Sequence, residues 1–386
     1  MYKISNKELL ELFRVMTWLD EARWDNLPVI KNPSYEALPP EQRLLVHWLC
    51  YITDRQRPYR QVWDKGGQIF STIVNDYTSK RFPILPEGTI KSFLNNYRDM
   101  KSDKKVKPFV SVDEGKSITY TPRYGSDLKS IIRTLTILLK YDKNFAQFID
   151  KQIRLWKEED EPLVHVAYAL DLLTYRNKIS IQKANELLTS KEKFQRNLKK
   201  WNRTKGHKRL WAALRDYRKP GGLFFKDLKE ALDPELASVW ASDRFPLNQL
   251  ELPGDIWNER MNKNLVINLA EKAGIEVKRR KNYKESPLIA RLIYEKIKTK
   301  NSKYYPERLD VSFDFAPRMC DRCNEGMYKV CPFGEGSSKI CYKEKENGEE
   351  KYCPVTLITC GYLKNCDPEG CPILEHIGKG LCRRIV

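Results

Sequence analysis

Lys208 is the residue of this sequence best placed to act as a nucleophile. It opens an expected helix that runs to Tyr217, and Lys205, His207 and Arg209 are its near neighbours. A lysine amine becomes nucleophilic when desolvation or nearby cations lower its pKa. Such an amine can attack an electrophilic carbon and form a Schiff base, so we predict that Lys208 does covalent chemistry.

Asp255 supplies a carboxylate in a comparable position. It follows Pro253-Gly254 and precedes Ile-Trp-Asn-Glu-Arg, which is typical of a turn that leads into a helix with Asp255 at its N-cap. The positive end of the helix keeps such a carboxylate ionised and directed. It can stabilise a carbon that becomes positive as its leaving group departs, or activate an attacking group. Simple capping is the alternative, and both roles can coexist.

The window 191–219 around Lys208 is strongly basic. It holds twelve Lys and Arg against two acidic residues, a net charge of +10, with Trp201 and Trp211 interleaved. A solvated helix face is one interpretation. However, the glycine-containing turn before Lys208 can offer backbone N–H groups to a phosphate. The expected nucleic-acid contacts are Arg203, Lys205, His207, Arg209 and Arg215.

The composition of the whole chain favours a polyanionic partner. The 386 residues include 70 Lys+Arg and 51 Asp+Glu, a formal net charge of +19, and cationic proteins gain affinity for nucleic acid by releasing its counterions. An anionic membrane is the competing partner. The sequence has no run of about 18 apolar residues and no apolar signal-peptide core at its start. We therefore expect a cytoplasmic, monomeric protein with no membrane partner.

Nine of the ten cysteines lie after residue 319. Without an export signal, this crowding favours metal or cluster ligation over disulfides. Thiolates in fours suit either a [4Fe–4S] cluster or zinc, and repeated Cys-Pro pairs favour iron–sulfur. We expect the metal mainly to hold together a segment too poor in apolar residues to fold unaided. The predicted ligands are Cys320, Cys323, Cys331, Cys341, Cys353, Cys360, Cys366 and Cys371, with Cys382 left over.

The order of the two reactive segments resembles that of the helix–hairpin–helix DNA glycosylase superfamily, and most closely the archaeal 8-oxoguanine DNA glycosylase type. The resemblance covers roughly residues 195–275 and implies that the protein flips a modified base out of DNA and cleaves its N-glycosidic bond. It implies that Lys208 attacks the sugar C1′, that Asp255 is the essential carboxylate, and that Arg215 lies on the pocket side of the lysine helix. The turn before Lys208 departs from the family's Leu-Pro-Gly-Val-Gly hairpin. If Lys208 only contacts phosphate, Asp255 and water suffice for a monofunctional glycosylase without lyase activity.

Aromatic and amide side chains can grip an extruded base by stacking and by hydrogen bonds to its edge. We name four candidates for such a pocket: Gln61, Trp63, Trp211 and Trp257. For the stretch 54–63, an ordinary helix with a solvated face is the preferred interpretation.

The elements that must position these residues are predominantly helical. Apolar residues recur at steps of three and four, which predicts helices over 40–52, 61–77, 127–139, 143–156, 162–175, 180–189, 208–219 and 226–232. One hairpin is expected, over 108–121. We predict an all-α fold with two helical subdomains, a base-binding cleft between them, and a small Cys-rich metal-binding segment. The expected domains are 1–125, 126–312 and 313–386.

Two other classes of function compete with the glycosylase. One is a non-catalytic nucleic-acid-binding protein whose thiolate-bound metal is purely structural. The other, a metal-dependent nuclease, is disfavoured because the sequence has no compact set of Asp, Glu and His residues for magnesium.

Overall fold

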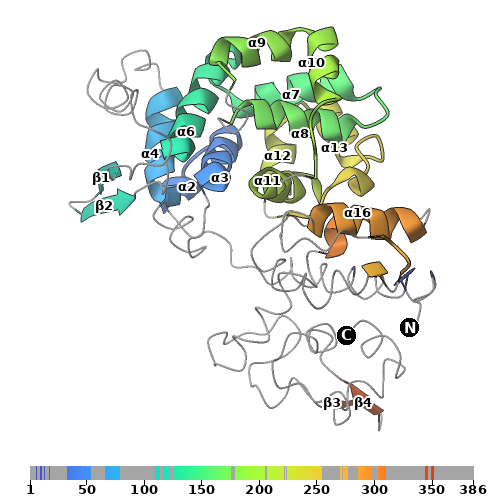
Figure 1. Cartoon of the computed structure of the whole chain (residues 1–386). Helices are drawn as coiled ribbons and strands as arrows, with labels where there is room; N and C mark the ends of the chain where they lie inside the picture. Colours follow the sequence, from blue (N-terminus) through green and yellow to red (C-terminus); the bar gives the residue numbers. More distant parts are fainter. Residues whose placement is uncertain are drawn as a thin grey trace. The chain divides into compact units, whose positions relative to one another are not determined.

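The structure of the protein is a computed structural model. It describes residues 33–53, 66–78, 109–113, 116–120, 125–174, 179–204, 207–220, 222, 224–253, 270–271, 273–276, 286–297, 303–309, 344–346 and 349–351, together with five single positions before residue 18. The described residues are mainly helical, which confirms the expected fold class (Figure 1).

The chain divides into two compact units that are each discontinuous in sequence. Unit 1 comprises 1–27, 202–211 and 247–386, and unit 2 comprises 28–201 and 212–246. The domains expected from the sequence are continuous stretches. The helix that begins at Lys208 contributes its first residues to unit 1 and the remainder to unit 2.

The core of unit 2 is built around helix α8, Pro162–Leu172, all of whose residues are buried. Its sequence is apolar on every side, the pattern of a helix surrounded by other elements. It contacts α7, Phe145–Trp156, and α9, Ile181–Thr189. Pro162 stands in the first turn, where its missing N–H costs nothing.

Helix α3, Pro40–Thr53, contacts α4, α6, α7 and α12 (Figure 1). Trp48 on α3 donates its indole N–H to Thr134 on α6, Gly125–Leu138, over 3.2 Å. Tyr77 on α4, Gly67–Thr78, donates to the carbonyl of Leu135 over 2.7 Å. These hydrogen bonds use polar atoms of buried side chains, so the helices are tied at fixed positions. The short helices α2, Pro33–Glu36, and η2, Leu139–Tyr141, precede α3 and follow α6.

Side-chain caps set the N-termini of several helices in unit 2. Asn144 accepts from two backbone N–H groups of α7, and Ser180 caps α9. Ser190 ends α9 and caps α10, Lys191–Leu198. Asp233 caps α13, Pro234–Ala241, whose proline occupies the first turn. The sequence analysis did not predict α10 or α13, although a serine or an aspartate-proline pair at these positions is an ordinary helix-start signal.

Helix α11, Lys208–Arg218, ends just before Pro220, as the sequence predicted. Gly222 follows in a tight turn in which its N–H donates to the carbonyl of Lys219. A Cβ on Gly222 would lie 2.6 Å from the carbonyl oxygen of Asp216 and 2.9 Å from that of Lys219. Only glycine fits this approach, and the turn leads directly into α12, Phe225–Ala231.

Two antiparallel hairpins are present among the described residues. Strands β1, Phe109–Asp113, and β2, Lys116–Tyr120, pair with Asp113 opposite Lys116, so the predicted hairpin is confirmed. Strands β3, Glu344–Glu346, and β4, Glu349–Lys351, were not predicted. Asn347-Gly348 joins them, and this pair is among the strongest hairpin signals in any sequence.

In unit 1, helix α16, Ser286–Ile297, contacts the short helix η6, Pro306–Leu309, and η6 also contacts η3, Leu247–Gln249. Phe13 from the N-terminal segment is fully buried and packs against the rings of Tyr294 and Tyr304. Thr17 donates to the carbonyl of Lys303 over 3.4 Å. The start of the chain therefore packs on segments almost three hundred residues later.

Candidate active site

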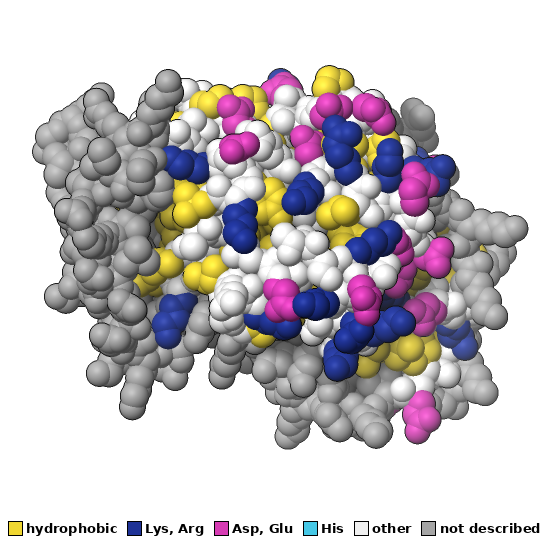
Figure 2. All heavy atoms as spheres, turned by 90° about the horizontal axis from the view of Figure 1, so that it is seen from above, with side chains coloured by type: hydrophobic (Ala, Val, Ile, Leu, Met, Phe, Trp, Pro, Cys, Tyr) yellow, Lys and Arg dark blue, Asp and Glu magenta, His cyan; other side chains and the backbone are white. Residues whose placement is uncertain are grey.

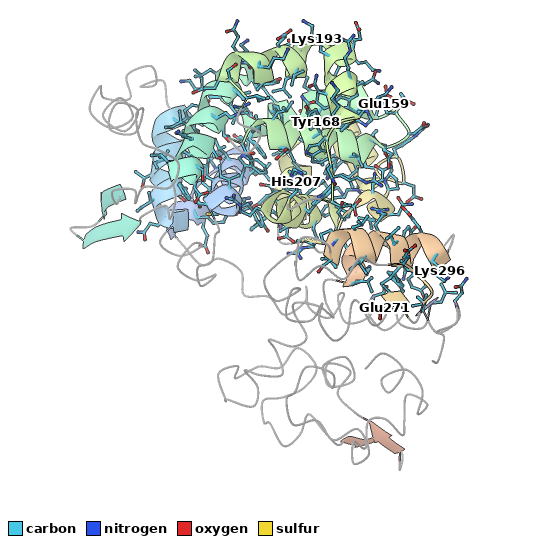
Figure 3. All side chains as sticks on the ribbon, in the orientation of Figure 1. Glu159, Tyr168, Lys193, His207, Glu271 and Lys296 are labelled. Atoms are coloured by element: carbon cyan, nitrogen blue, oxygen red, sulfur yellow. The ribbon has the colours of Figure 1, made fainter. Side chains whose placement is uncertain are left out.

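Lys208 is the first residue of α11, so the prediction that it opens a helix is confirmed. His207 immediately precedes it and is labelled beside the start of α11 in Figure 3. The side chain of Lys208 and the whole of Lys205 lie outside the described residues. Arg209 is half-buried.

The other predicted reactive and pocket residues fall mostly outside the described part of the chain. These are Asp255, Gln61, Trp63, Trp257 and all eight predicted metal ligands, Cys320, Cys323, Cys331, Cys341, Cys353, Cys360, Cys366 and Cys371.

A buried carboxylate, that of Glu251, lies four positions before Asp255 in the sequence and pairs with Arg203, five positions before Lys208. The side chain of Glu251 is 0% exposed, and its Oε1 is 2.9 Å from Nε of Arg203 and 2.8 Å from Nη2 of Arg291. Arg291 also places its Nε within 3.1 and 3.2 Å of the two carboxylate oxygens. Burial raises the pKa of Glu251, and the guanidinium groups of Arg291 and Arg203 oppose that rise. One carboxylate thus joins two arginines from distant parts of unit 1.

The two arginines of this cluster are also fixed by hydrogen bonds that involve backbone carbonyls. Arg291, on α16, donates to the carbonyl of Asn248 over 2.8 Å and to that of Leu250 over 3.3 Å. Asn248 is in η3 and Leu250 is the residue after it, so both bonds fix the end of that short helix. The carbonyl of Arg203 accepts the indole N–H of Trp211, on α11, over 2.8 Å.

The loop that leads to Lys208 is held by further contacts of its own. Nε2 of His207 is 3.1 Å from the carbonyl oxygen of Asn202. The side chain of Asn202 accepts from both the backbone N–H and the hydroxyl of Thr204. The segment before α11 is therefore tied to itself, to α11 and, through Glu251, to the segment before Asp255.

Sequence reasoning did not single out Glu251. The available signal was a lone acidic residue in the apolar stretch Leu250-Glu-Leu-Pro253. A carboxylate at such a place is buried only when cations pair with it, and the basic window offered those cations.

No family model, no curated protein and no solved structure matches this chain.

The structure gives structural contacts to several residues that were expected to bind nucleic acid or a base. Trp211 is 1% exposed, and its indole N–H is used by Arg203. Arg215 is buried, with its Nε 2.8 Å from Oδ1 of Asp216. His207 is also buried. These placements favour roles in packing and in fixing the loop over direct contact with a ligand.

A second buried polar network joins α3 to α12 in unit 2. Tyr35 donates to Oδ2 of Asp227 over 2.9 Å, and Arg43 donates to Oδ1 of Asp227 through both Nε and Nη2. The Tyr35 hydroxyl also contacts Nε2 of His47, whose ring stacks on Phe224 with centroids 3.3 Å apart. Burial, together with the nearby Arg43, lowers the pKa of His47 well below its usual value, so the ring is neutral. The Tyr35 contact and the Phe224 ring hold His47 in the core of unit 2.

The cations of α10 are largely compensated by acidic neighbours. Lys191 pairs with Glu159 over 2.7 Å, Lys193 pairs with Glu186, and Arg196 pairs with Glu192 four residues before it. Figure 2 shows Lys and Arg side chains interleaved with Asp and Glu on the face seen from above, and Figure 3 labels Lys193 and Glu159 in this region.

The two lysines that follow α10 differ from those on the helix. Lys199 and Lys200 are exposed, and neither forms an ion pair with any residue in the described part of the chain. Among the described cations of this window, they are therefore well placed to meet a phosphate.

Among the residues that the structure describes, no three His, Cys, Asp or Glu side chains form a group that could hold a metal ion. In the same part of the chain, no helix is both long enough and apolar enough to span a membrane.

Proposed function

We propose that the protein is a DNA glycosylase that flips a damaged or modified base out of the duplex and excises it, with Lys208 as nucleophile and Asp255 as the essential carboxylate. The observation that carries this proposal is the contact of Glu251 with Arg203. It joins a residue five positions before Lys208 to a residue four positions before Asp255.

Chain geometry limits how far each reactive residue can lie from this contact. Four residues of extended chain span at most about 14 Å, and five span at most about 18 Å. A nucleotide extruded from DNA needs its C1′ within reach of both an amine and a carboxylate. The contact of Glu251 with Arg203 supports this arrangement because it limits how far apart the backbones that carry Lys208 and Asp255 can lie.

The strong positive charge supports DNA as the partner. The formal net charge of +19 favours a polyanion. The exposed lysines 199 and 200 precede the Arg203 loop directly, so backbone contacts there would lie on the same segment of chain as the proposed nucleophile.

The cysteine-rich segment is proposed to bind a [4Fe–4S] cluster, with zinc as the alternative. Its role is to stabilise the last part of the chain. Iron, acid-labile sulfide and zinc analysis of anaerobically purified protein distinguishes the two, since zinc brings neither iron nor sulfide.

Borohydride trapping tests the proposed chemistry. A Schiff base between Lys208 and the sugar is reduced to a stable amine, so the full chain should become covalently attached to duplex DNA that carries its target base. Lys208→Gln should abolish trapping, and Asp255→Asn should lower base release about 10²–10³-fold. Lys226→Gln and Asp243→Asn, which change exposed residues, serve as matched controls.

The outcomes separate the candidate functions. Base release without trapping assigns a monofunctional glycosylase that relies on Asp255 and water. The same assays are run over a panel of oxidised, alkylated and hypermodified bases. If the protein binds DNA tightly but shows neither base release nor trapping with any of them, it is a non-catalytic nucleic-acid-binding protein.

A further inference from the structure

Glu251, Arg203 and Arg291 form an enclosed group of charges among the described residues of unit 1. The Glu251 side chain is 0% exposed and that of Arg291 is 10% exposed, whereas that of Arg203 is 24% exposed. Burying charged groups carries a large desolvation penalty, and well-packed apolar side chains often give the same stability or more. The distinctive property of such a cluster is the fixed geometry of its hydrogen bonds.

The three residues come from three separate parts of the chain. Arg203 lies in the loop before α11, Glu251 follows η3, and Arg291 is on α16. Arg291 also binds the carbonyls of Asn248 and Leu250, so it fixes the backbone that carries Glu251. Arg291 therefore fixes Glu251 to α16, and Arg203 connects Glu251 to the loop before α11.

The loop that carries Arg203 transmits this constraint to Lys208. The carbonyl of Arg203 accepts from Trp211, which is buried on the first turns of α11. His207, next to Lys208, holds the carbonyl of Asn202. A shift of Arg203 therefore shifts the residues on both sides of Lys208.

We propose that Glu251 is a positioning residue whose buried carboxylate holds the loop before Lys208 against the segment before Asp255, so that base excision depends on a side chain that does not touch the DNA. This inference rests on the proposed function for its catalytic readout. The geometric part of it, a link between the two segments, can be measured separately.

The expected effect of losing the link follows from the tolerance of catalysis to misplacement. A displacement of about 1 Å between reacting groups can cost on the order of 10² in rate. Contacts between DNA phosphates and exposed lysines do not depend on that alignment. Loss of Glu251 should therefore lower the rate of excision and leave DNA affinity nearly unchanged.

The variant for this test is Glu251→Met combined with Arg291→Met. Removing only one partner of a buried ion cluster leaves an uncompensated charge, whereas replacing the pair with apolar side chains can preserve the fold. Arg203 is partly exposed, so its guanidinium can reach water in this variant. The matched control is Glu235→Met with Lys157→Met, which replaces an exposed ion pair of unit 2.

Three quantities are measured on the full chain of each variant: single-turnover excision rate, affinity for the same DNA, and backbone amide exchange over 203–211 and 250–256. We expect the Glu251/Arg291 variant to unfold at nearly the wild-type temperature and to bind DNA within about threefold of wild type. We expect its excision rate to fall about 100-fold, and amide exchange to become at least tenfold faster in both segments. The control should match the wild type in all three.

Wild-type excision by the Glu251/Arg291 variant overturns the proposal, as does a fall in DNA affinity that accounts for the fall in rate. If the wild-type protein itself excises no base, the proposed function fails and amide exchange decides the link alone. If amide exchange is then faster in both segments of the Glu251/Arg291 variant, the conclusion that Glu251 links them stands. If exchange is unchanged, that conclusion is wrong.

Discussion

Gly222 lies where the chain has no room for a side chain. It follows α11 in the turn that leads to α12, and its Cα faces the carbonyl oxygens of Asp216 and Lys219. The same region contains the buried pair of Asp216 with Arg215. The turn therefore sets the direction in which the chain leaves the helix begun by Lys208.

We predict that Gly222→Ala destabilises the protein by about 1–3 kcal/mol, the usual cost of forcing extra atoms into a packed site. The obstructing atoms are backbone carbonyls, which cannot move aside as a flexible side chain could. Gly67→Ala is the control, because a Cβ at Gly67 would meet nothing within 4 Å. Urea denaturation should show the Gly67 variant unchanged or slightly more stable, and equal stability of the two variants would contradict the prediction.

Helices α9 and α10 are joined by an ion pair as well as by packing. Glu186 on α9 accepts from Lys183, over 2.9 Å, and from Lys193 on α10. These two hydrogen bonds lower the pKa of Glu186 to about 2. The carboxylate is exposed, so solvent and salt weaken its effect on stability.

The lowered pKa of Glu186 predicts a definite pH dependence. A carboxyl with a lower pKa in the folded than in the unfolded protein stabilises the fold when pH lies above its ordinary pKa of 4.5, and this stabilisation is lost as pH falls toward 2. Glu186→Gln should therefore be less stable than wild type near neutral pH, and the difference should shrink as pH falls below about 4.5. Urea midpoints measured across this range check the prediction.

The control for that measurement removes the two cations instead of the carboxylate. In a Lys183→Met, Lys193→Met background, Glu186→Gln should no longer produce a pH-dependent difference. A difference that persists in this background would show that another partner of Glu186 is responsible.

The net charge of +19 does not mean that every cationic side chain can contact a polyanion. Many cations of the basic window are paired with carboxylates, among them Lys191, Lys193 and Arg196. Arg203 and Arg215 are engaged in ion pairs as well. Net charge alone therefore overstates how many of these groups can meet a phosphate.

Lys199 and Lys200 are the exception, and we predict that they contact the DNA backbone. Replacing both with Gln should reduce the steepness of the plot of log affinity against log salt by about 1.8, because each lost phosphate contact removes about 0.9. The control is Lys140→Gln with Lys229→Gln, which removes two equally exposed cations from elsewhere in the chain. Binding titrations at several salt concentrations measure these slopes. Equal slopes for the two double variants would contradict the prediction that Lys199 and Lys200 contact the DNA backbone.

The helical class, the hairpin formed by β1 and β2, and the start and end of α11 could all be predicted from the sequence. These features depend on local signals: apolar periodicity, turn residues, and proline or glycine after a helix. Helices α10 and α13 and the strands β3 and β4 were not predicted, although local signals for them are present. The basic residues around α10 and the cysteines around β3 and β4 gave the stronger signals in those parts of the sequence.

Only the tertiary structure decided which charged residues face inward. The local sequence around Arg203, Arg215 and Glu251 does not show whether each side chain binds a ligand or forms an internal ion pair. A guanidinium before a helix can equally meet a phosphate or a buried carboxylate. The choice depends on partners such as Arg291, which lies 40 residues after Glu251. Pairing over such distances in sequence depends on how the chain folds back on itself, and no local pattern encodes it.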